Sequence, residues 1–299
     1  MLKEVIQKKS IRTNQEKIKN LLGEIKVIYT DVDGTLLGPD GCFFLDTERQ
    51  YTLKPAQALV AVLERNIDIV MISGRHIRQL RENARVFGFK NYIAEMGTQI
   101  VYNLGEEVIL NLGDFKKTEE SVFKTIEKSG VLDLLRQTYQ RKLEDHTPWS
   151  SERDCTPLFR GYVDVNEANE LLRQKGYENL VLVDNGVIPR KSETLDVPEM
   201  HAYHLIPRGV GKESGIKIDR RIRKIPKKAA IAIGDAVADL PFAQEVGAFF
   251  MVKNGLVKNS HLAEQILEAE NIFVTENEMG LGWAEVVEWI TQETETVGI

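Results

Sequence analysis

The sequence has few cysteines, no excess of positive charge and no long apolar run. Only two of its 299 residues are cysteine, Cys42 and Cys155, and their wide separation favours free thiols over a disulfide or a zinc site. The formal net charge of -6 argues against a nucleic-acid partner, which needs a concentrated basic surface. With no run of about 18 apolar residues and no signal-like N-terminus, a membrane partner is not expected either. We therefore expect a cytoplasmic protein, whose oligomeric state the sequence does not indicate.

The first third of the sequence alternates between apolar strands and amphipathic helices. A β-branched run ends at Asp31, followed by a helix over 55–66, a buried strand over 67–73, a helix over 75–86 and a third strand over 91–96. Continuous apolar strands of this length are typical of a parallel sheet that is covered on both faces. The predicted fold class is therefore α/β, with a Rossmann-like parallel-sheet core.

The alternation stops near residue 98. Residues 98–112 are predicted to form a hairpin, 119–140 a long helix, and 179–190 a second hairpin that turns at residues 184–186. Hairpins belong to antiparallel sheets, so residues 99–200 are predicted to form an inserted α+β domain.

The parallel pattern resumes at residue 201. Residues 1–98 and 201–299 are therefore assigned to the core domain, in which 1–25 form a leading helix. Two of its predicted strands are 201–206 and 228–235.

Two carboxylates follow the first strand, in the segment Asp31-Val32-Asp33-Gly34-Thr35. In open α/β sheets, ligands bind at the carboxyl ends of the strands. Two carboxylates aimed at one site repel each other unless a cation such as Mg²⁺ holds them. The local alternative is an ordinary Asp-Gly turn.

Two later segments offer groups that bind anions. Ser73 and Gly74 lie where the second strand meets a helix, so a hydroxyl and backbone N–H groups can hold a phosphate. The simpler local interpretation is an N-cap serine. Lys212, between glycines at a helix start, can reach the same phosphate. Lys217 is an alternative, but its place in the helix predicts that it faces solvent.

A fourth segment adds two carboxylates after another buried strand. Asp235 ends the strand, and Asp239 lies one helical turn later on the same face, so the two can converge on one ion. The alternative is an N-cap with a first-turn dipole partner. All four segments occupy the carboxyl ends of predicted strands, and together they supply what metal-assisted phosphoryl transfer needs.

The order DVDGT, ISGR, a lysine at a helix start and GDAVAD resembles the four signature motifs of the haloacid dehalogenase (HAD) superfamily. The resemblance implies that Asp31 is the nucleophile and Asp33 the general acid and base. It implies that the phosphoryl oxygens are held by Ser73, Gly74 and Lys212.

The same resemblance implies a Mg²⁺ site. Its ligands would be Asp31, Asp33 through its backbone carbonyl, Asp235 and, directly or in support of the others, Asp239. An aspartate two residues after the nucleophile is typical of the phosphatases and phosphomutases of this superfamily.

The inserted domain is similar to the α/β cap of the Cof-like group, which includes sugar-phosphate phosphatases. The loop Arg153-Asp154-Cys155-Thr156-Pro157-Leu158 resembles the cap loop of mannosyl-3-phosphoglycerate phosphatases. The loop from His146 to Arg160 is the expected contact with the leaving group. Arg75, Arg153 and Arg160 are the candidate substrate binders, each with a solvated surface side chain as the alternative.

Two positions depart from the Cof-like pattern. Ala238 stands where the fourth motif has asparagine, and Met96 follows Glu95 where asparagine is usual. Both changes weaken a transfer of substrate specificity.

Three functions are consistent with the motifs. The first is a Mg²⁺-dependent phosphatase that acts on a small phosphorylated metabolite, a sugar phosphate or a phosphorylated sugar acid, through an aspartyl-phosphate. The second is a phosphomutase of the same superfamily, although the insert shows no arginine cluster for a second phosphate. The third is a non-enzymatic regulatory or binding descendant, which only Ala238 favours.

Overall fold

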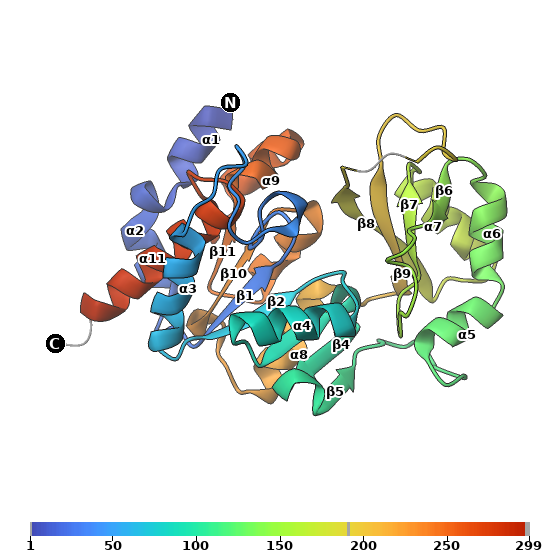
Figure 1. The fold of residues 1–299 in the computed structure, drawn as a ribbon, viewed down its shortest axis with the longest axis horizontal. Helices are drawn as coiled ribbons and strands as arrows, with labels where there is room; N and C mark the ends of the chain where they lie inside the picture. Colours follow the sequence, from blue (N-terminus) through green and yellow to red (C-terminus); the bar gives the residue numbers. More distant parts are fainter. Residues whose placement is uncertain (1, 190–191, 297–299) are drawn as a thin grey trace.

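A large sheet runs through one half of the computed structural model, which describes residues 2–189 and 192–296. Its eight strands lie in the order β12-β11-β10-β1-β2-β3-β4-β5 (Figure 1). The strands from β12 to β3 are parallel, whereas β4 and β5 add antiparallel pairs at one edge. Their bounds are β1 Val27–Asp31, β2 Asp68–Ile72, β3 Asn91–Ala94, β4 Gln99–Tyr102, β5 Glu107–Leu110, β10 Ala230–Gly234, β11 Ala248–Met251 and β12 Ile272–Val274.

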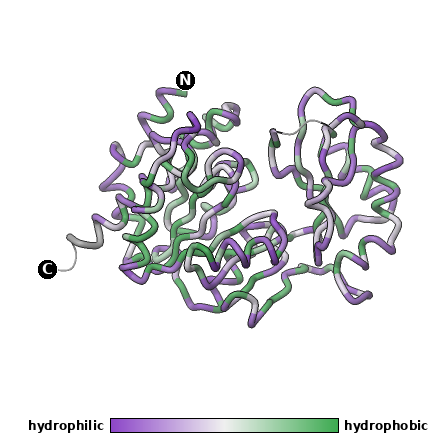
Figure 2. Tube along the Cα trace, viewed as in Figure 1, coloured by the Kyte–Doolittle hydropathy of each residue, from purple (hydrophilic) through white to green (hydrophobic). Residues whose placement is uncertain are grey.

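Helices cover both faces of this sheet, as the continuous apolar strands require. Every residue of β1, β10 and β11 is buried, and in Figure 2 the strands of this half are predominantly hydrophobic. One face packs against α2 (Ile11–Leu21), α3 (Lys54–Glu64), α4 (Ile77–Phe87) and α11 (Met279–Thr296). The other packs against α1 (Leu2–Lys9), α8 (Lys212–Ile222), the 3-10 helix η5 (Val237–Gln244), α9 (Lys253–Lys258) and α10 (Ala263–Glu268).

The second half of the molecule is a smaller unit that spans residues 122–207, which we call the cap (right in Figure 1). Its four-stranded antiparallel sheet has the order β6-β7-β9-β8. The strands are β6 Leu143–Asp145, β7 Leu158–Gly161, β8 Leu180–Val187 and β9 His201–Pro207, and the helices are α5 Val122–Lys128, α6 Val131–Thr138 and α7 Val165–Gln174. Phe159, Tyr203 and Leu205 pack with the helices on one face of the sheet.

The opposite face of the cap sheet looks toward the core. Successive residues of a strand point to opposite faces. Arg160 and His204 therefore lie on the face opposite to the one that carries Phe159 and Tyr203. His204 approaches Gly74 of the core, because a Cβ placed on Gly74 would lie 2.5 Å from the His204 Nε2 atom. The cap therefore presents this face to the carboxyl ends of β1 and β2.

The predicted boundaries of the insert are wrong at both ends. The hairpin over 98–112 belongs to the large sheet, because β4 pairs with β3 through Ala94↔Gln99 and its neighbours. Segment 201–206 is a cap strand, because β9 pairs with β7 and β8 rather than with a core strand. The periodicity of a segment does not reveal which sheet its strands join, and this accounts for both errors.

Some predicted elements are divided in the structure. The leading helix over 1–25 becomes α1 and α2, because Ser10 caps the second helix by accepting the N–H of Thr13 at 3.2 Å. The helix over 119–140 breaks at Gly130, which has φ +82°. Residues 184–186 are a bulge within β8 rather than a turn. The described residues do not include Met1, residues 190–191 and residues 297–299. These residues fall at the ends of predicted segments or within the insert.

No helix of the described ranges is long and apolar enough to cross a membrane. Both cysteines are free thiols, with Cys155 buried and Cys42 partly exposed.

Candidate active site

Three neighbouring strands end side by side at the site. Asp31 is the last residue of β1, and it pairs with Ile72 of β2, the residue before Ser73. On the other side of β1, Thr30 pairs with Ile233, which lies two residues before Asp235. The parallel register therefore brings Asp31, Ser73 and Asp235 to the carboxyl edge of one sheet.

Lys212 lies between two carboxylates at this edge. As the first residue of α8, it places its Nζ 2.7 Å from Oδ1 of Asp31 and 2.8 Å from Oδ1 of Asp239, and all three side chains are buried. Burial alone would lower the pKa of Lys212, but Asp239 and Asp31 outweigh it and raise that pKa. The ammonium therefore stays charged throughout the neutral range.

Asp239 holds this arrangement together. Its Oδ2 accepts the backbone N–H groups of Asp235 at 3.1 Å and Ala236 at 3.0 Å, while its Oδ1 accepts from Lys212. A carboxylate that accepts N–H groups at the start of a helix stabilises that turn. Asp239 was predicted as a direct or supporting metal partner, and its contacts favour support, because both of its oxygens are already engaged.

Asp235 is supported by groups from two other segments. Its Oδ1 accepts from the Thr35 hydroxyl at 3.3 Å, and its Oδ2 accepts from the Asn254 amide at 3.2 Å. Gly34 makes room for it: the residue has φ +83°, and a Cβ there would lie 2.6 Å from Oδ2 of Asp235. The DVDGT glycine is therefore required both by its backbone conformation and by the packing of this carboxylate.

The donor set fits a hard divalent cation. Carboxylate oxygens of Asp31, Asp235 and Asp239 lie within 4.8 Å of one another in buried positions. Lys212 balances one of these three negative charges, and the half-exposed Lys258, 3.5 Å from Asp235, is screened by solvent, so oxygen-loving Mg²⁺ is a suitable further counter-charge. Asp31 and Asp235 are the side chains that would hold it. Asp33 turns its carboxylate elsewhere, so only its backbone carbonyl remains a predicted ligand.

Protons compete with the metal at this cluster. Burial, followed by repulsion from Asp239, raises the pKa of Asp235 to about 6, and burial also raises the pKa of Asp31 well above its ordinary value. A carboxyl group with a raised pKa is protonated as the pH falls through that value, and Mg²⁺ must then displace a proton. We expect the apparent Mg²⁺ affinity to fall about tenfold per pH unit below pH 6, as linkage to one proton predicts.

Thermal-shift titrations with Mg²⁺ at pH 7.5, 6.0 and 5.0 measure this dependence. In the metal-free protein, lowering the pH should increase stability, because protonation removes buried negative charge. The contribution of Asp235 to the free energy of unfolding therefore increases as the pH falls through about 6. Asp235→Asn should lose both the Mg²⁺ response and this pH dependence. An affinity that is equal at pH 7.5 and 5.0 would contradict the assignment of Asp235 as a ligand.

Ser73 is placed to donate a hydrogen bond. Its side chain is buried, and its Oγ accepts the backbone N–H of Arg75 at 3.2 Å. That bond uses a lone pair of the oxygen, so the hydroxyl hydrogen remains for an acceptor such as a phosphoryl oxygen. Ser73, Gly74 and the start of α4 thus have the geometry that the predicted phosphate-binding turn requires.

Asp33 forms a forked ion pair with Arg75. The guanidinium Nε donates to Oδ2 at 2.8 Å and Nη2 donates to Oδ1 at 2.5 Å, and Nη1 of Arg75 also donates to Asn83 at 3.1 Å. The Asp33 side chain is 56% exposed, so it stands at the mouth of the site rather than among the buried carboxylates. Arg75, predicted as a substrate binder, instead fixes the orientation of Asp33.

The structure gives both cap arginines partners within the protein. Arg153 is buried and donates to Gly74 O at 2.6 Å, to Thr156 O at 2.6 Å and to Thr156 Oγ1 at 2.9 Å. Arg160 lies on the face of the cap that looks toward the core, but its Nε donates to Glu144 at 2.7 Å. Both guanidinium groups donate to acceptors within the protein. The sequence could not reveal these acceptors, because they come near the arginines only in the fold.

Two residues that contribute to the region escaped the sequence analysis. Asn254 donates to Asp235 and to Gly34 O at 2.9 Å, and its own oxygen accepts the N–H of Met279. It lies three residues after the end of β11, so the rule about carboxyl ends of parallel strands could have found it. Glu95 was noted only as part of an altered motif, although its carboxylate is completely buried.

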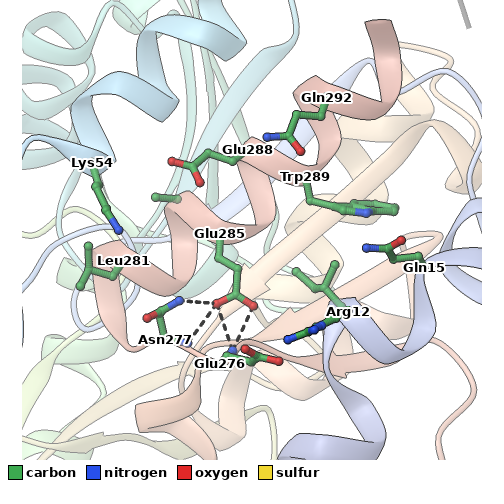
Figure 3. Close-up of a pocket in the computed structure, with 12 residues that line it drawn as sticks. Arg12, Gln15, Lys54, Glu276, Asn277, Leu281, Glu285, Glu288, Trp289 and Gln292 are labelled. Carbon is green, nitrogen blue, oxygen red and sulfur yellow. Dashed lines mark hydrogen bonds between the residues drawn. The ribbon is translucent and has the colours of Figure 1, made fainter. Parts of the chain in front are cut away.

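A separate cavity of about 280 Å³ lies between α2, α3 and α11, remote from the four motifs (Figure 3). Its charges are mixed, since Arg12 and Lys54 share it with three glutamates. Glu285 is already engaged, because it accepts the backbone N–H groups of Glu276 and Asn277. None of the motif residues lines this cavity, so the chemistry belongs to the sheet edge.

Comparison with known protein families identifies one match that spans most of the chain. A family model described as haloacid dehalogenase-like hydrolase matches residues 28–272. Among curated proteins, the phosphoglycolate phosphatase of Methanopyrus kandleri is 25% identical over 247 residues, which covers 82% of this chain and 91% of the relative. The phosphoglycolate phosphatase of Methanothrix thermoacetophila is also 25% identical, and covers 88% of this chain and 96% of its own length.

Solved structures share the fold at lower identity. The sucrose-phosphatase of Synechocystis sp. PCC6803 superposes with a TM-score of 0.62 at 12% identity, and the match covers 90% of this chain and 98% of that one. A phosphatase of the haloalkanoate superfamily from Bacteroides thetaiotaomicron gives a TM-score of 0.60 at 17% identity, covering 89% and 95%. At these identities the similarity establishes the architecture, a parallel-sheet core with an additional antiparallel cap sheet.

Proposed function

The chain belongs to the haloacid dehalogenase-like hydrolases, and we propose that it is a Mg²⁺-dependent phosphatase that acts through an aspartyl-phosphate on Asp31. The family and the phosphatases related to this chain support a phosphoric monoester hydrolase. One observation carries the proposal: Asp31 lies 2.7 Å from a buried lysine and within 4.8 Å of two further carboxylates at the end of a central strand. A nucleophile in this setting can attack a phosphate whose charge is neutralised nearby.

The first step would transfer the phosphoryl group to the protein. An oxygen of Asp31 forms a bond to phosphorus, and the bond between phosphorus and the leaving-group oxygen breaks in line with it. Asp33 would carry a proton when substrate is bound and give it to the departing oxygen, and the forked contact with Arg75 then orients the ionised carboxylate. Ser73 and Lys212 hold phosphoryl oxygens by donating hydrogen bonds.

The second step would release inorganic phosphate. Asp33, now ionised, takes a proton from a water molecule, whose oxygen bonds to phosphorus while the bond to Asp31 breaks. Asp31 returns as a carboxylate and Asp33 is again protonated. Lys212 and Asp239 are unchanged at the end, so their contact holds the phosphate pocket throughout the cycle.

Asp31 and Asp235 would hold the metal, which would supply charge neutralisation and so reduce the repulsion between these carboxylates and the phosphate. The three buried carboxylates support this part of the proposal, because Lys212 is the one buried cation beside them in the described residues and Lys258, 3.5 Å from Asp235, is half-exposed. Without the cation, Asp31 would repel a phosphate dianion instead of attacking it.

The proposed substrate is a small phosphorylated metabolite, either a sugar phosphate or a phosphorylated hydroxy or sugar acid. The named activity of two relatives is directed at phosphoglycolate, and the cap covers the sheet edge with a face that carries polar side chains. A mutase is disfavoured, because Arg153 and Arg160 are both engaged within the protein and do not form a second phosphate site. The family assignment and the phosphatases related to this chain argue against a purely regulatory role. The cytoplasmic location remains a prediction.

A panel of phosphomonoesters tests the proposal. Phosphoglycolate, sugar phosphates and phosphorylated sugar acids are incubated with the protein and Mg²⁺, or with EDTA, and released phosphate is measured. We expect Mg²⁺-dependent release from at least one member and almost none with EDTA. Isomerised product that needs a bisphosphorylated activator would indicate a mutase. Release that is unaffected by EDTA would contradict the metal-dependent mechanism.

A further inference from the structure

Glu95 joins the core to the cap through a completely buried carboxylate. It follows β3 on the core, yet its partners belong to the cap loop: Oε1 accepts the N–H of Asp154 at 3.0 Å, and Oε2 accepts those of Cys155 at 3.1 Å and Thr156 at 2.6 Å. The Thr156 hydroxyl adds a fourth bond at 3.0 Å. Because a buried carboxylate is stable only when its lone pairs are satisfied, this loop is fixed to Glu95.

Arg153 returns from the same loop to the core. Its guanidinium is 3.6 Å from the Glu95 carboxylate and donates to the carbonyl of Gly74, the residue after the phosphate-binding Ser73. Both members of the Glu95 and Arg153 pair are at most 1% exposed. A buried pair of this kind costs desolvation energy and is usually retained for a specific arrangement rather than for stability.

The backbone of Glu95 is attached to the phosphate loop as well. Its N–H donates to Arg75 O at 3.0 Å, and the N–H of Met96 donates to Ser73 O at 3.2 Å. Glu95 and Met96 have φ of +46° and +60°, a left-handed conformation that side chains rarely adopt and that persists only where the surroundings enforce it. Loop 73–75 is therefore bonded to Glu95 on one side and to Arg153 on the other.

We propose that Glu95 is a positioning residue, which with Arg153 docks cap loop 153–156 onto loop 73–75 and so sets the shape of the phosphate pocket. The effect extends to Asp33, because Arg75 belongs to the docked loop and orients that carboxyl. The cap thus contributes to phosphate binding through the core loop, not only to the choice of the leaving group. Only the catalytic part of this inference rests on the proposed function.

Glu95→Gln is the variant that tests the inference. It preserves the shape of the side chain but removes the charge and places an amide N–H₂ against N–H donors. Glu82→Gln is the matched control, because Glu82 lies exposed on α4 and pairs only with neighbouring arginines of that helix. Glu95→Asp retains the charge and should recover part of the loss.

Hydrogen exchange measures the docking without reference to activity. In Glu95→Gln we expect the amides of 154–156 to exchange at least tenfold faster than in the parent, with faster exchange also in 73–75 and 95–96. Faster exchange confined to 154–156 would overturn the coupling. Glu82→Gln should match the parent in all three segments.

Phosphate binding measures the consequence for the pocket. We expect Glu95→Gln to weaken the binding of inorganic phosphate at least tenfold in the presence of Mg²⁺, and to raise the KM of a hydrolysed ester more than it lowers kcat. A lower Tm with unchanged phosphate affinity would reduce Glu95 to a structural residue and overturn the proposal. If the parent hydrolyses no ester, exchange and phosphate binding still decide the role of Glu95, while the phosphatase proposal alone fails.

Discussion

Replacing Asp31 by asparagine should abolish turnover while leaving the protein folded. The amide is nearly isosteric with the carboxylate but cannot form the covalent phosphate, and loss of a nucleophile typically reduces kcat by about 10⁴-fold or more. Steady-state phosphate release, measured on whichever ester the parent hydrolyses, gives the ratio. Residual turnover close to that of the parent would exclude Asp31 as the nucleophile.

The stability of the same variant distinguishes chemistry from unfolding. Burial, opposed by Lys212, raises the pKa of Asp31 well above its ordinary value, so the ionised carboxylate is not a source of stability in the metal-free protein. We therefore expect Asp31→Asn to match or exceed the parent in metal-free Tm, and to lose most of the stabilisation by Mg²⁺. Asp133→Asn, an exposed change on the cap, is the control and should alter neither turnover nor the Mg²⁺ response.

The parallel core could be predicted because most of its strands carry their own signal. A continuous apolar run, such as the one that ends at Asp31, must be buried on both faces, and the helices between such runs follow from periodicity. The strand β12 was missed because three residues are too short for a recognisable pattern. The hairpin after residue 98 was recognised, but its pairing with β3 depends on long-range contacts that local periodicity does not contain.

The clustering of the site residues could also be predicted, because most of them lie at the ends of strands. Asp31, Ser73 and Asp235 each lie at the end of a strand. The rule that ligands bind at the carboxyl ends of parallel strands therefore predicts that they lie together, and the register of β1 with its two neighbours brings them to one edge. Lys212 followed from its place at a helix start. The sequence could not predict the partners of Arg75 and Arg153. A charged side chain can pair with residues that are distant in the sequence, and only the fold brings these residues near.

The fourth motif leaves two roles open for Asp239, as a direct metal ligand or in support of the ligands. The sequence placed it one helical turn after Asp235 and suggested convergence on an ion, which the grouping of their oxygens within 4.8 Å permits. The hydrogen bonds nevertheless use both of its oxygens for Lys212 and for the backbone of Asp235 and Ala236. Its contribution to the metal site is therefore to keep the lysine in place.

Replacing Lys212 by methionine should have the second largest effect, on both stability and activity. Methionine fills a similar volume but leaves Asp31 and Asp239 buried without their cation, and the loss of one partner of a buried pair costs about 3–5 kcal/mol. Since the folded pKa of Lys212 is raised, its stabilising effect is fully present at neutral pH and is lost only at strongly alkaline pH. Turnover should fall about 10²–10³-fold, because the charge that holds the phosphoryl oxygens is gone.

The pH dependence of this variant separates electrostatics from packing. Without the ammonium, Asp31 and Asp239 leave buried negative charge unbalanced. Lowering the pH from 8 to 5 should therefore restore part of the lost unfolding free energy by protonating Asp31, whose pKa burial already raises. Mg²⁺ at neutral pH should restore stability by the same neutralisation. Lys217→Met on the exposed side of the same helix serves as the control for the substitution itself. A stability deficit that is equal at pH 5 and 8 would show that Lys212 contributes through packing alone, and the charge balance on which the phosphate pocket depends would have to be assigned to other residues.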